Sequence, residues 1–163
     1  MTSLKTLLLA FAALCLGGCA VFPISSVKPG MSREEVVATM GPPGAVVDLR
    51  PGTRLQYSGQ PGGQFAFMVD LDAAGRVGSV RQVLTEKDFG RITPGKWTQA
   101  DVLREFGRPA LIERVASWKG DILTYRWYGL QDMFYWVYLD GGRVVQKAHA
   151  GVEERPSMAV DTP

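Results

Sequence analysis

Two short segments of the chain carry apolar residues at i, i+1 and i+4, the spacing that places them on one side of an α-helix. In each segment a serine or threonine precedes the stripe and an acidic residue follows it by three positions, as in a helix N-terminal capping box. The first segment comprises Ser32, Glu35, Val36, Val37, Met40 and the terminating Gly41, and the second comprises Thr98, Asp101, Val102, Leu103, Phe106 and the terminating Gly107. A proline follows each glycine shortly afterwards, which ends a helix. We therefore predict two helices of about nine residues, each too short to be stable unless it docks on another element.

Each predicted helix is followed by runs in which alternate residues are apolar, as in strands. The longest runs are residues 65–72 and 133–140, and both lead through a glycine turn into an Arg-Val pair. Shorter runs at 55–57 and 123–125 precede them at equivalent places. Each unit is therefore predicted to be one capped helix followed by an antiparallel meander of three or four strands.

These correspondences predict an α+β fold of two tandem repeats, each a short capped helix packed on a three- to four-stranded antiparallel meander. The first repeat covers residues 27–85, a junction covers 86–91, the second repeat covers 92–150, and a flexible C-terminal tail covers 151–163. The alternative is a single α+β domain in which two helix starts resemble each other by chance.

Comparing the two units separates the core from the surface in their longest strands, because alternate strand residues face opposite sides. The face that is apolar in both units is assigned to the core and comprises Phe65, Phe67, Val69 and Leu71, and Met133, Tyr135, Val137 and Leu139. The opposite face changes from Ala66, Met68 and Asp70 in the first unit to Phe134, Trp136 and Tyr138 in the second.

The aromatic face of the second unit exceeds what a core requires and is a candidate partner-binding surface. The preceding strand adds Arg126 and Tyr128, so the candidate residues are Arg126, Tyr128, Phe134, Trp136 and Tyr138. Two alternatives remain open: this face packs against the first unit, or the C-terminal tail covers it.

The N-terminus carries one early positive charge, Lys5, and an apolar run over residues 7–14. That run is too short to span a bilayer comfortably but suits a signal-peptide hydrophobic region. The stretch that follows, Leu16-Gly17-Gly18-Cys19, resembles the bacterial lipobox. A plain secretory signal or a short hydrophobic helix is the alternative.

The lipobox resemblance implies a lipoprotein signal peptide over residues 1–18, then a lipidated Cys19 and a short linker over 19–26. Cys19 would carry a diacylglycerol and an N-acyl chain such as palmitate, which together anchor a protein stably. Ala20 stands where lipoproteins retained at the inner membrane usually carry Asp, so it resembles the pattern for export to the outer membrane.

The remaining composition indicates no catalytic or metal chemistry. The formal net charge is +2, which does not suggest a nucleic-acid surface. Cys15 would leave with the signal peptide, so no disulfide is expected. His149 is the only histidine and has no cysteine or carboxylate at ligand spacing, so neither a metal site nor a catalytic triad is predicted. We expect no enzyme activity and no cofactor beyond the lipid; a hydrolase would have to depend on His149.

The helix signature resembles that of the SmpA/OmlA (BamE-like) family of outer-membrane lipoproteins. The matching residues are Gly30, Met31, Ser32, Val36, Met40, Gly41 and Pro43, with Gly95, Thr98, Val102, Phe106, Gly107 and Pro109 in the second unit. The second unit departs from the signature at Lys96-Trp97, and typical members carry one unit. The resemblance implies helices on a small antiparallel sheet and a role in outer-membrane β-barrel assembly and envelope integrity.

A tandem pair of such units also resembles β-lactamase inhibitory proteins, which bind an enzyme through an aromatic sheet. The sequence therefore predicts a lipid-anchored protein on the periplasmic face of the bacterial outer membrane. We expect a non-catalytic scaffold or accessory whose partner is the outer-membrane assembly machinery or another envelope protein. The alternative is a periplasmic protein-binding or enzyme-inhibitor module.

Overall fold

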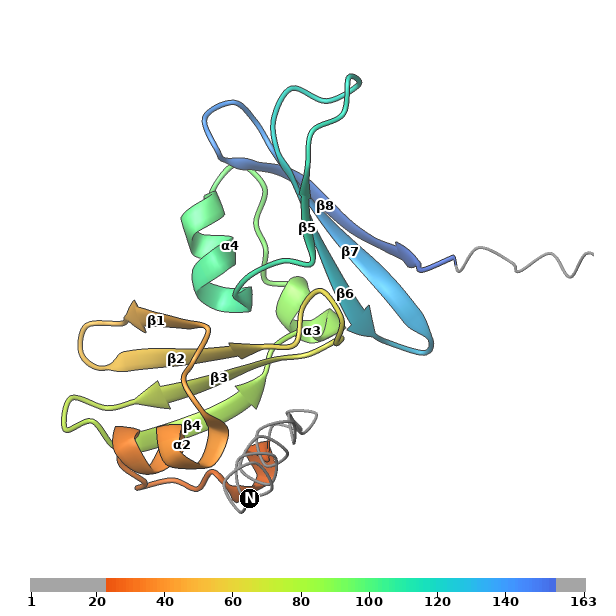
Figure 1. The fold of residues 1–163 in the computed structure, drawn as a ribbon. Helices are drawn as coiled ribbons and strands as arrows, with labels where there is room; N and C mark the ends of the chain where they lie inside the picture. The colour runs from red at the N-terminus through yellow and green to blue at the C-terminus, as the bar shows by residue number, and fades with distance from the viewer. Residues whose placement is uncertain (1–22, 155–163) are drawn as a thin grey trace, which may run out of the picture.

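The computed structural model describes residues 23–154 and shows an α+β fold with two four-stranded antiparallel sheets (Figure 1). The first half contains the 3-10 helix η2 (Ile24–Ser26), helix α2 (Arg33–Met40) and strands β1 (Ala45–Asp48), β2 (Thr53–Ser58), β3 (Ala66–Leu71) and β4 (Val77–Gln82). The second half contains helices α3 (Glu86–Phe89) and α4 (Gln99–Phe106) and strands β5 (Leu111–Glu113), β6 (Ile122–Tyr128), β7 (Asp132–Leu139) and β8 (Val145–Val152). Both sheets keep the strands in chain order, so each is a meander. The α+β class predicted from the sequence is confirmed.

Capping boxes begin both eight-residue helices. In α2 the Ser32 hydroxyl accepts from the Glu35 N–H, and the Glu35 carboxylate accepts from the Ser32 N–H. In α4 Thr98 and Asp101 exchange the same pair of bonds, at 3.3 and 2.8 Å. The hydrogen bond from the Thr98 N–H, and then the one that the Thr98 hydroxyl donates at 2.7 Å, lower the pKa of the Asp101 carboxyl. Both helices end at a glycine with positive φ.

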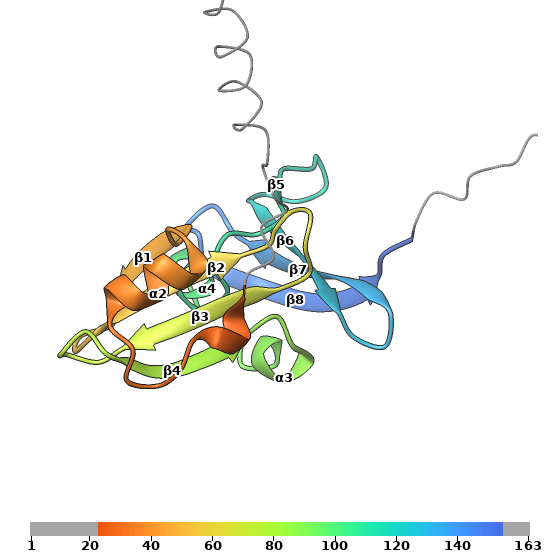
Figure 2. The same ribbon diagram turned by 60° about the horizontal axis from the view of Figure 1, so that its bottom comes forward.

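Each sheet packs one face against the helix that precedes it, and Figure 2 shows α2 across the first sheet. The buried contacts of α2 are with Leu55, Tyr57, Val69, Leu71 and Val77, and those of α4 include Leu123, Tyr125, Val137 and Leu139. A tyrosine in each core donates its hydroxyl to the glycine carbonyl that ends the helix: Tyr57 to Gly41 (3.0 Å) and Tyr125 to Gly107 (2.9 Å). The face of β3 and β7 assigned to the core lies on these helices.

The other face of the first sheet is covered by the second half of the chain, so the sheet lies between α2 and α4 (Figure 1). Ala66 and Met68 of β3 are buried in the same cluster as Phe106 of α4. The buried Gln56 side chain donates to the carbonyls of Leu103 and Arg104 at the end of α4, at 3.0 and 2.9 Å. The two halves therefore share one continuous interface.

A buried ionic network reinforces that interface. The Arg54 guanidinium binds both carboxylate oxygens of Asp70, at 2.6 and 2.9 Å, and lies 3.4 Å from the Glu105 carboxylate of α4. Arg91 and Arg104 also contact Glu105. Burial raises the pKa of the Glu105 carboxyl, but attraction to Arg54 and then to the other two guanidinium groups outweighs burial and leaves that pKa lowered.

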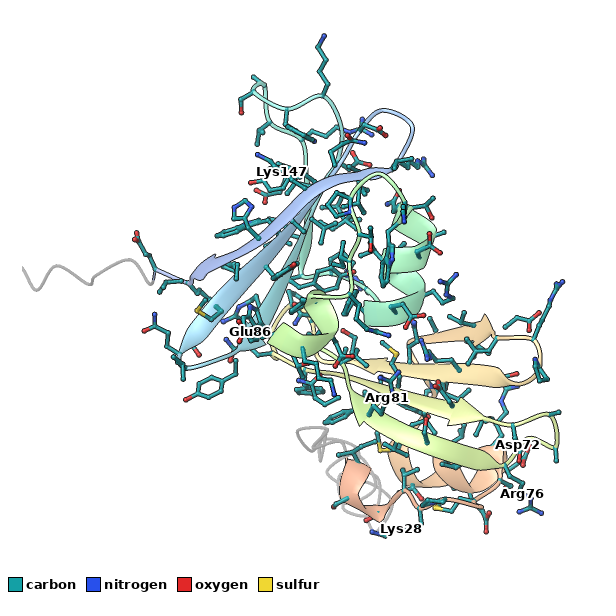
Figure 3. The ribbon with its side chains drawn as sticks, turned by 180° about the vertical axis from the view of Figure 1, so that it is seen from behind. Lys28, Asp72, Arg76, Arg81, Glu86 and Lys147 are labelled. Carbon is teal, nitrogen blue, oxygen red and sulfur yellow. The ribbon has the colours of Figure 1, made fainter. Side chains whose placement is uncertain are left out.

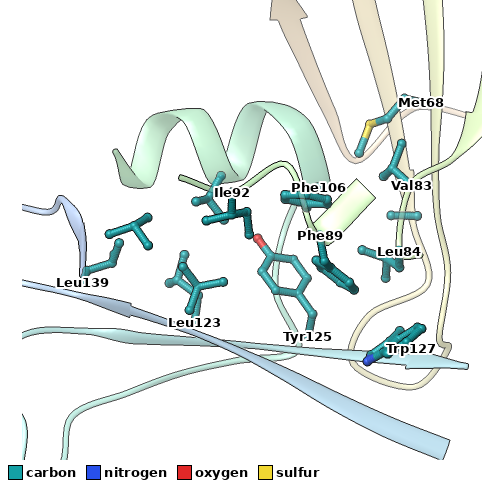
Figure 4. Packing of buried hydrophobic residues seen from close by; sticks show 14 residues of the cluster. Met68, Val83, Leu84, Phe89, Ile92, Phe106, Leu123, Tyr125, Trp127 and Leu139 are labelled. Carbon is teal, nitrogen blue, oxygen red and sulfur yellow. The ribbon is translucent and has the colours of Figure 1, made fainter. Parts of the chain in front are cut away.

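The segment predicted as a junction, residues 86–91, contributes to the core. It forms α3, and Phe89 at its end is 1% exposed (Figure 4). The Phe89 ring stacks on Tyr135 at 4.0 Å and on Phe106 at 4.9 Å. Phe89 therefore packs between the two halves, so the junction contributes a buried aromatic side chain to the core as well as connecting the halves.

Candidate protein-binding face

The three aromatic residues singled out on β7 lie on the face of the second sheet that points away from α4. Phe134 pairs across the sheet with Arg126, and Trp136 pairs with Thr124 on one side and His149 on the other. Phe134, Trp136 and Tyr138 are half-buried, and no helix of residues 23–154 covers this face (Figure 1). The alternative that this face packs against the first unit holds at one end only, where Arg126 bonds the Pro61 and Gly62 carbonyls; the buried contact between the units is made by Ala66 and Met68 of the first sheet.

The aromatic residues form a continuous row with neighbours on β8. His149 lies 5.3 Å from Trp136 and is stacked on Tyr138 at 5.4 Å between ring centroids. Phe134 extends the row beside Trp136 at 5.6 Å. Lys147 places its Nζ 4.2 Å from the centre of the Tyr138 ring (Figure 3). Because the rings support one another, the row is a preformed surface rather than a set of free side chains.

His149 therefore belongs to the aromatic face, a placement that the sequence interpretation missed, together with Lys147 and Trp118. Trp118 contacts Tyr138 at 5.2 Å and donates its indole N–H to the Leu139 carbonyl at 2.7 Å. The signal for the two β8 residues is the glycine turn at 141–142, which makes β7 and β8 a hairpin and places same-face residues opposite each other. Within residues 23–154 no cluster of His, Cys, Asp or Glu could hold a metal ion.

A groove of about 390 Å³ runs beside the aromatic row. Its lining includes Pro61, Leu111, Glu113, Thr124, Phe134 and Trp136. Thr124 is buried and donates its hydroxyl to the Glu113 carboxylate at 3.2 Å. The side chain opposite the row, Leu111, is 51% exposed. The groove is therefore lined mainly by apolar side chains and holds one carboxylate, that of Glu113, which is the mixture of apolar walls and few polar groups found in binding pockets.

Arg126, a candidate partner-binding residue, makes its hydrogen bonds within the chain instead. Its guanidinium donates to Glu153 (3.0 Å) and to the carbonyls of Pro61 and Gly62 (2.9 and 3.2 Å). The Gln60 side chain binds both the backbone N–H and the carbonyl of Arg126, at 3.1 and 2.6 Å. Arg126 therefore holds the loop of the first sheet against the second sheet and closes one end of the groove, which makes it a positioning residue.

Tyr128, the last candidate, lies at the end of β6 and is 66% exposed. It is paired with Asp132 beside the hairpin, beyond the row, so it borders the face without joining the ring contacts. The strand β8 runs to Val152, past the predicted end of the second unit at residue 150.

The lipidation residue Cys19, the signal segment 1–18 and residues 155–163 lie outside the described residues. The helices found between residues 23 and 154 are all too short or too polar to span a membrane.

No protein-family model matches the chain, and no match was found among curated proteins. Among solved structures, the chain is similar to the crystal structure of a DUF4309 family protein (YjgB) from Bacillus subtilis. The identity is 12%, the match covers 75% of this chain and 78% of that chain, and the TM-score is 0.32. The SmpA/OmlA resemblance therefore continues to rest on the sequence motifs, and residues 23–154 form an α+β fold in which no helix covers the aromatic face of the second sheet.

Proposed function

We propose that this chain is a lipid-anchored, non-catalytic protein-binding module on the periplasmic face of the bacterial outer membrane. It acts there as an accessory in β-barrel protein assembly and envelope integrity, and it holds its partner on the aromatic face of the second sheet. The observation that supports this proposal best is the asymmetry between the two sheets. Both faces of the first sheet are packed against helices, whereas within residues 23–154 no helix covers the face of the second sheet that is richer in aromatic residues.

Equivalent positions of the two sheets show what this asymmetry means. On the first sheet, Gln56 and Met68 meet the end of α4. The corresponding positions on the second sheet hold Thr124 and Trp136, which line the groove. A small residue beside a large ring leaves a recess that accepts a side chain, and aromatic residues are enriched at the energetic centres of protein interfaces. The second face is thus suited to a partner of different shape from α4.

The tandem-repeat interpretation belongs to the same proposal. Both halves have a capped eight-residue helix, a four-stranded meander in chain order, and a tyrosine bonded to the glycine that ends the helix. These shared features favour two copies of one SmpA/OmlA-like unit over a chance likeness of two helix starts. The anchor in the proposal is supported by the lipobox resemblance at Cys19.

A matched pair of substitutions on β5 tests the binding face. Leu111 and Ile112 are each 51% exposed, but only Leu111 lines the groove. Acylated full-length protein is extracted from membranes in mild detergent, and its bound partners are identified for the parent, Leu111→Ser, Ile112→Ser and Trp136→Ala. We expect a specific partner to be lost with Leu111→Ser and Trp136→Ala and kept with Ile112→Ser. Equal retention by all variants would exclude this face.

The identity of the retained partner separates the two functions that the sequence left open. A component of the outer-membrane assembly machinery supports the accessory role, and a soluble periplasmic enzyme supports the inhibitor alternative. Deletion of the gene should lower outer-membrane protein levels and sensitise cells to detergents and large antibiotics. Complementation by Ile112→Ser but not by Leu111→Ser links that phenotype to the groove. An unchanged outer membrane contradicts the accessory role.

The anchor is tested separately. Cells are grown with labelled palmitate, and we expect the label on the parent protein and not on Cys19→Ser. Membrane fractionation should place the parent with the outer membrane. Label retained by Cys19→Ser, or a soluble parent, contradicts the lipoprotein assignment.

A further inference from the structure

The edge of the second sheet offers unpaired backbone groups in a defined pattern. The strand β8 pairs with β7 on one side. On its other side the first residue, Val145, bonds Gly95 and Trp97, and no strand of residues 23–154 lies along the rest of that edge. The Glu153 N–H donates to the Asp132 carbonyl on the β7 side at 3.0 Å. In an antiparallel strand, successive residues direct their backbone N–H and C=O groups to opposite edges. Glu153 directs its N–H to β7, so the even-numbered residues just before it direct theirs to the open edge. The outward residues are Ala148, Ala150 and Val152.

The features that normally prevent another strand from adding to a sheet edge, a bulge and a lysine, occur only near the start of β8. The β7–β8 register shifts at Tyr138 and Leu139, opposite the beginning of β8, and Lys147 follows that irregularity. Bulges and edge lysines block the addition of another strand. Residues 148–152 carry neither a charge nor a proline. This stretch of the edge is therefore open to another strand.

The open stretch is complementary to itself. An antiparallel pairing of two copies centred on Ala150 sets Ala150 opposite Ala150 and Ala148 opposite Val152, and all of these turn their backbone groups outward. The same register sets Lys147 opposite Glu153, which already binds Arg126 at 2.8 Å. We propose that two copies of this chain associate through β8 in this register, forming one continuous eight-stranded sheet with about six new backbone hydrogen bonds.

An apolar pocket beside the same edge supports a second copy as the occupant. The pocket measures about 390 Å³ and is lined by Leu130, Met133 and Tyr135 together with Ala150 and Val152 of β8. Leu130 is fully exposed and Val152 is 49% exposed. Residues opposite each other in an antiparallel pair share a face, so the pairing brings the pockets of the two copies together and covers Val152.

Cysteine cross-linking tests the register. Full-length Lys147→Cys/Glu153→Cys is oxidised in detergent solution and compared with each single variant and with the parent chain. Positions 147 and 153 form a pair without direct backbone hydrogen bonds in the proposed dimer, where Cα atoms about 4.5 Å apart allow a disulfide. Within one chain these residues are too far apart along the strand to be bridged. We expect a cross-linked dimer from the double variant only, and equal cross-linking by either single variant overturns the register.

Charged residues introduced at Ala150, which lies opposite its own copy in the proposed dimer, test the dimer itself. Ala150 is exposed, so Ala150→Asp and Ala150→Lys should fold as the parent does. In sedimentation experiments, each variant alone should dimerise about fivefold more weakly than the parent, because like charges face each other. An equimolar mixture of the two variants should dimerise as the parent does, because opposite charges then face each other. The control is Ala116→Asp, because Ala116 is also exposed and lies in a loop; this variant should dimerise as the parent does.

A parent chain that stays monomeric at every concentration reached overturns the proposal, as does a dimer that is insensitive to both charges at position 150. Neither outcome affects the comparison of Leu111 with Ile112, because both of those residues lie on β5 at the opposite edge of the sheet.

Discussion

Replacing Phe89 with alanine should destabilise the whole protein rather than loosen a linker. Phe89 is 1% exposed and contacts rings from both α4 and the second sheet, with Tyr135 at 4.0 Å, Phe106 at 4.9 Å and Trp127 at 5.7 Å. It shares its buried cluster with Ala66 and Met68 of the first sheet. Its side chain is therefore part of the surface through which the two halves hold each other.

The magnitude follows from the loss of a buried aromatic ring. A Phe→Ala substitution in a core costs about 3–5 kcal/mol, as lost transfer energy and as the cavity left behind. That is a large share of the roughly 5–15 kcal/mol by which native proteins are stable. For a chain of this size, the loss corresponds to a fall in the melting temperature on the order of 10 °C.

Urea denaturation followed by tryptophan fluorescence measures this effect, with Val115→Ala as the control at an apolar loop residue that is 42% exposed. The control should change the free energy of unfolding by less than about 0.5 kcal/mol. A Phe89→Ala loss as small as that of the control refutes the conclusion that α3 is part of the core. Two separate transitions in the variant would show that Phe89 couples the two halves.

Three further changes test other parts of the structure. Glu105→Gln removes a carboxylate whose pKa is lowered on folding, because burial, which raises the pKa, is outweighed by attraction to Arg54 and the other arginines. Because the pKa is lower in the folded state, the carboxylate stabilises the fold above the unfolded pKa, and this stabilisation is lost as the pH falls through the folded pKa. Urea titrations should therefore show the parent with a larger free energy of unfolding than Glu105→Gln at neutral pH, and this difference should shrink in acid. A difference that does not depend on pH contradicts this. Thr98→Ala should cost about 1 kcal/mol in thermal unfolding through loss of the α4 cap, and an unchanged melting temperature would show that the cap is dispensable. Gly151→Ala would place a Cβ 2.5 Å from the Trp136 ring, so we expect an altered near-ultraviolet dichroism signal and a loss of about 1–3 kcal/mol, whereas Gly62→Ala, with nothing within 4 Å, should change neither.

The features predicted correctly from the sequence are those set by local rules. The capping residues Ser32 and Thr98 lie beside the groups that they satisfy, so spacing along the chain is enough to locate both helices. The core faces of β3 and β7 follow from strand alternation. Phe134, Trp136 and Tyr138 are found on one face for the same reason.

The features that were missed depend on contacts between distant parts of the chain. Arg126 was expected to face a partner, but its guanidinium binds the carbonyl of Pro61, which belongs to the other half. Phe89 lies in a four-residue helix without a periodic pattern, so nothing nearby indicates that it fills an interface. His149 joins the aromatic row only through the β7–β8 register, which the sequence interpretation did not work out.

The order of the elements along the chain explains why the same face is buried in the first sheet, at Met68, and half-buried in the second, at Trp136. Met68 and Gln56 are buried because α4 follows the first sheet in the chain and can fold back onto it. Among the described residues, no helix follows the second sheet, so Trp136 and Thr124 occupy equivalent places with no intramolecular cover. Pairing through β8 leaves that face open and sets the two aromatic faces on the same side of a continuous sheet, since opposed residues of antiparallel strands share a face. A partner with two equivalent elements would then engage both grooves at once, and the second contact would form at the high effective concentration that linked sites provide.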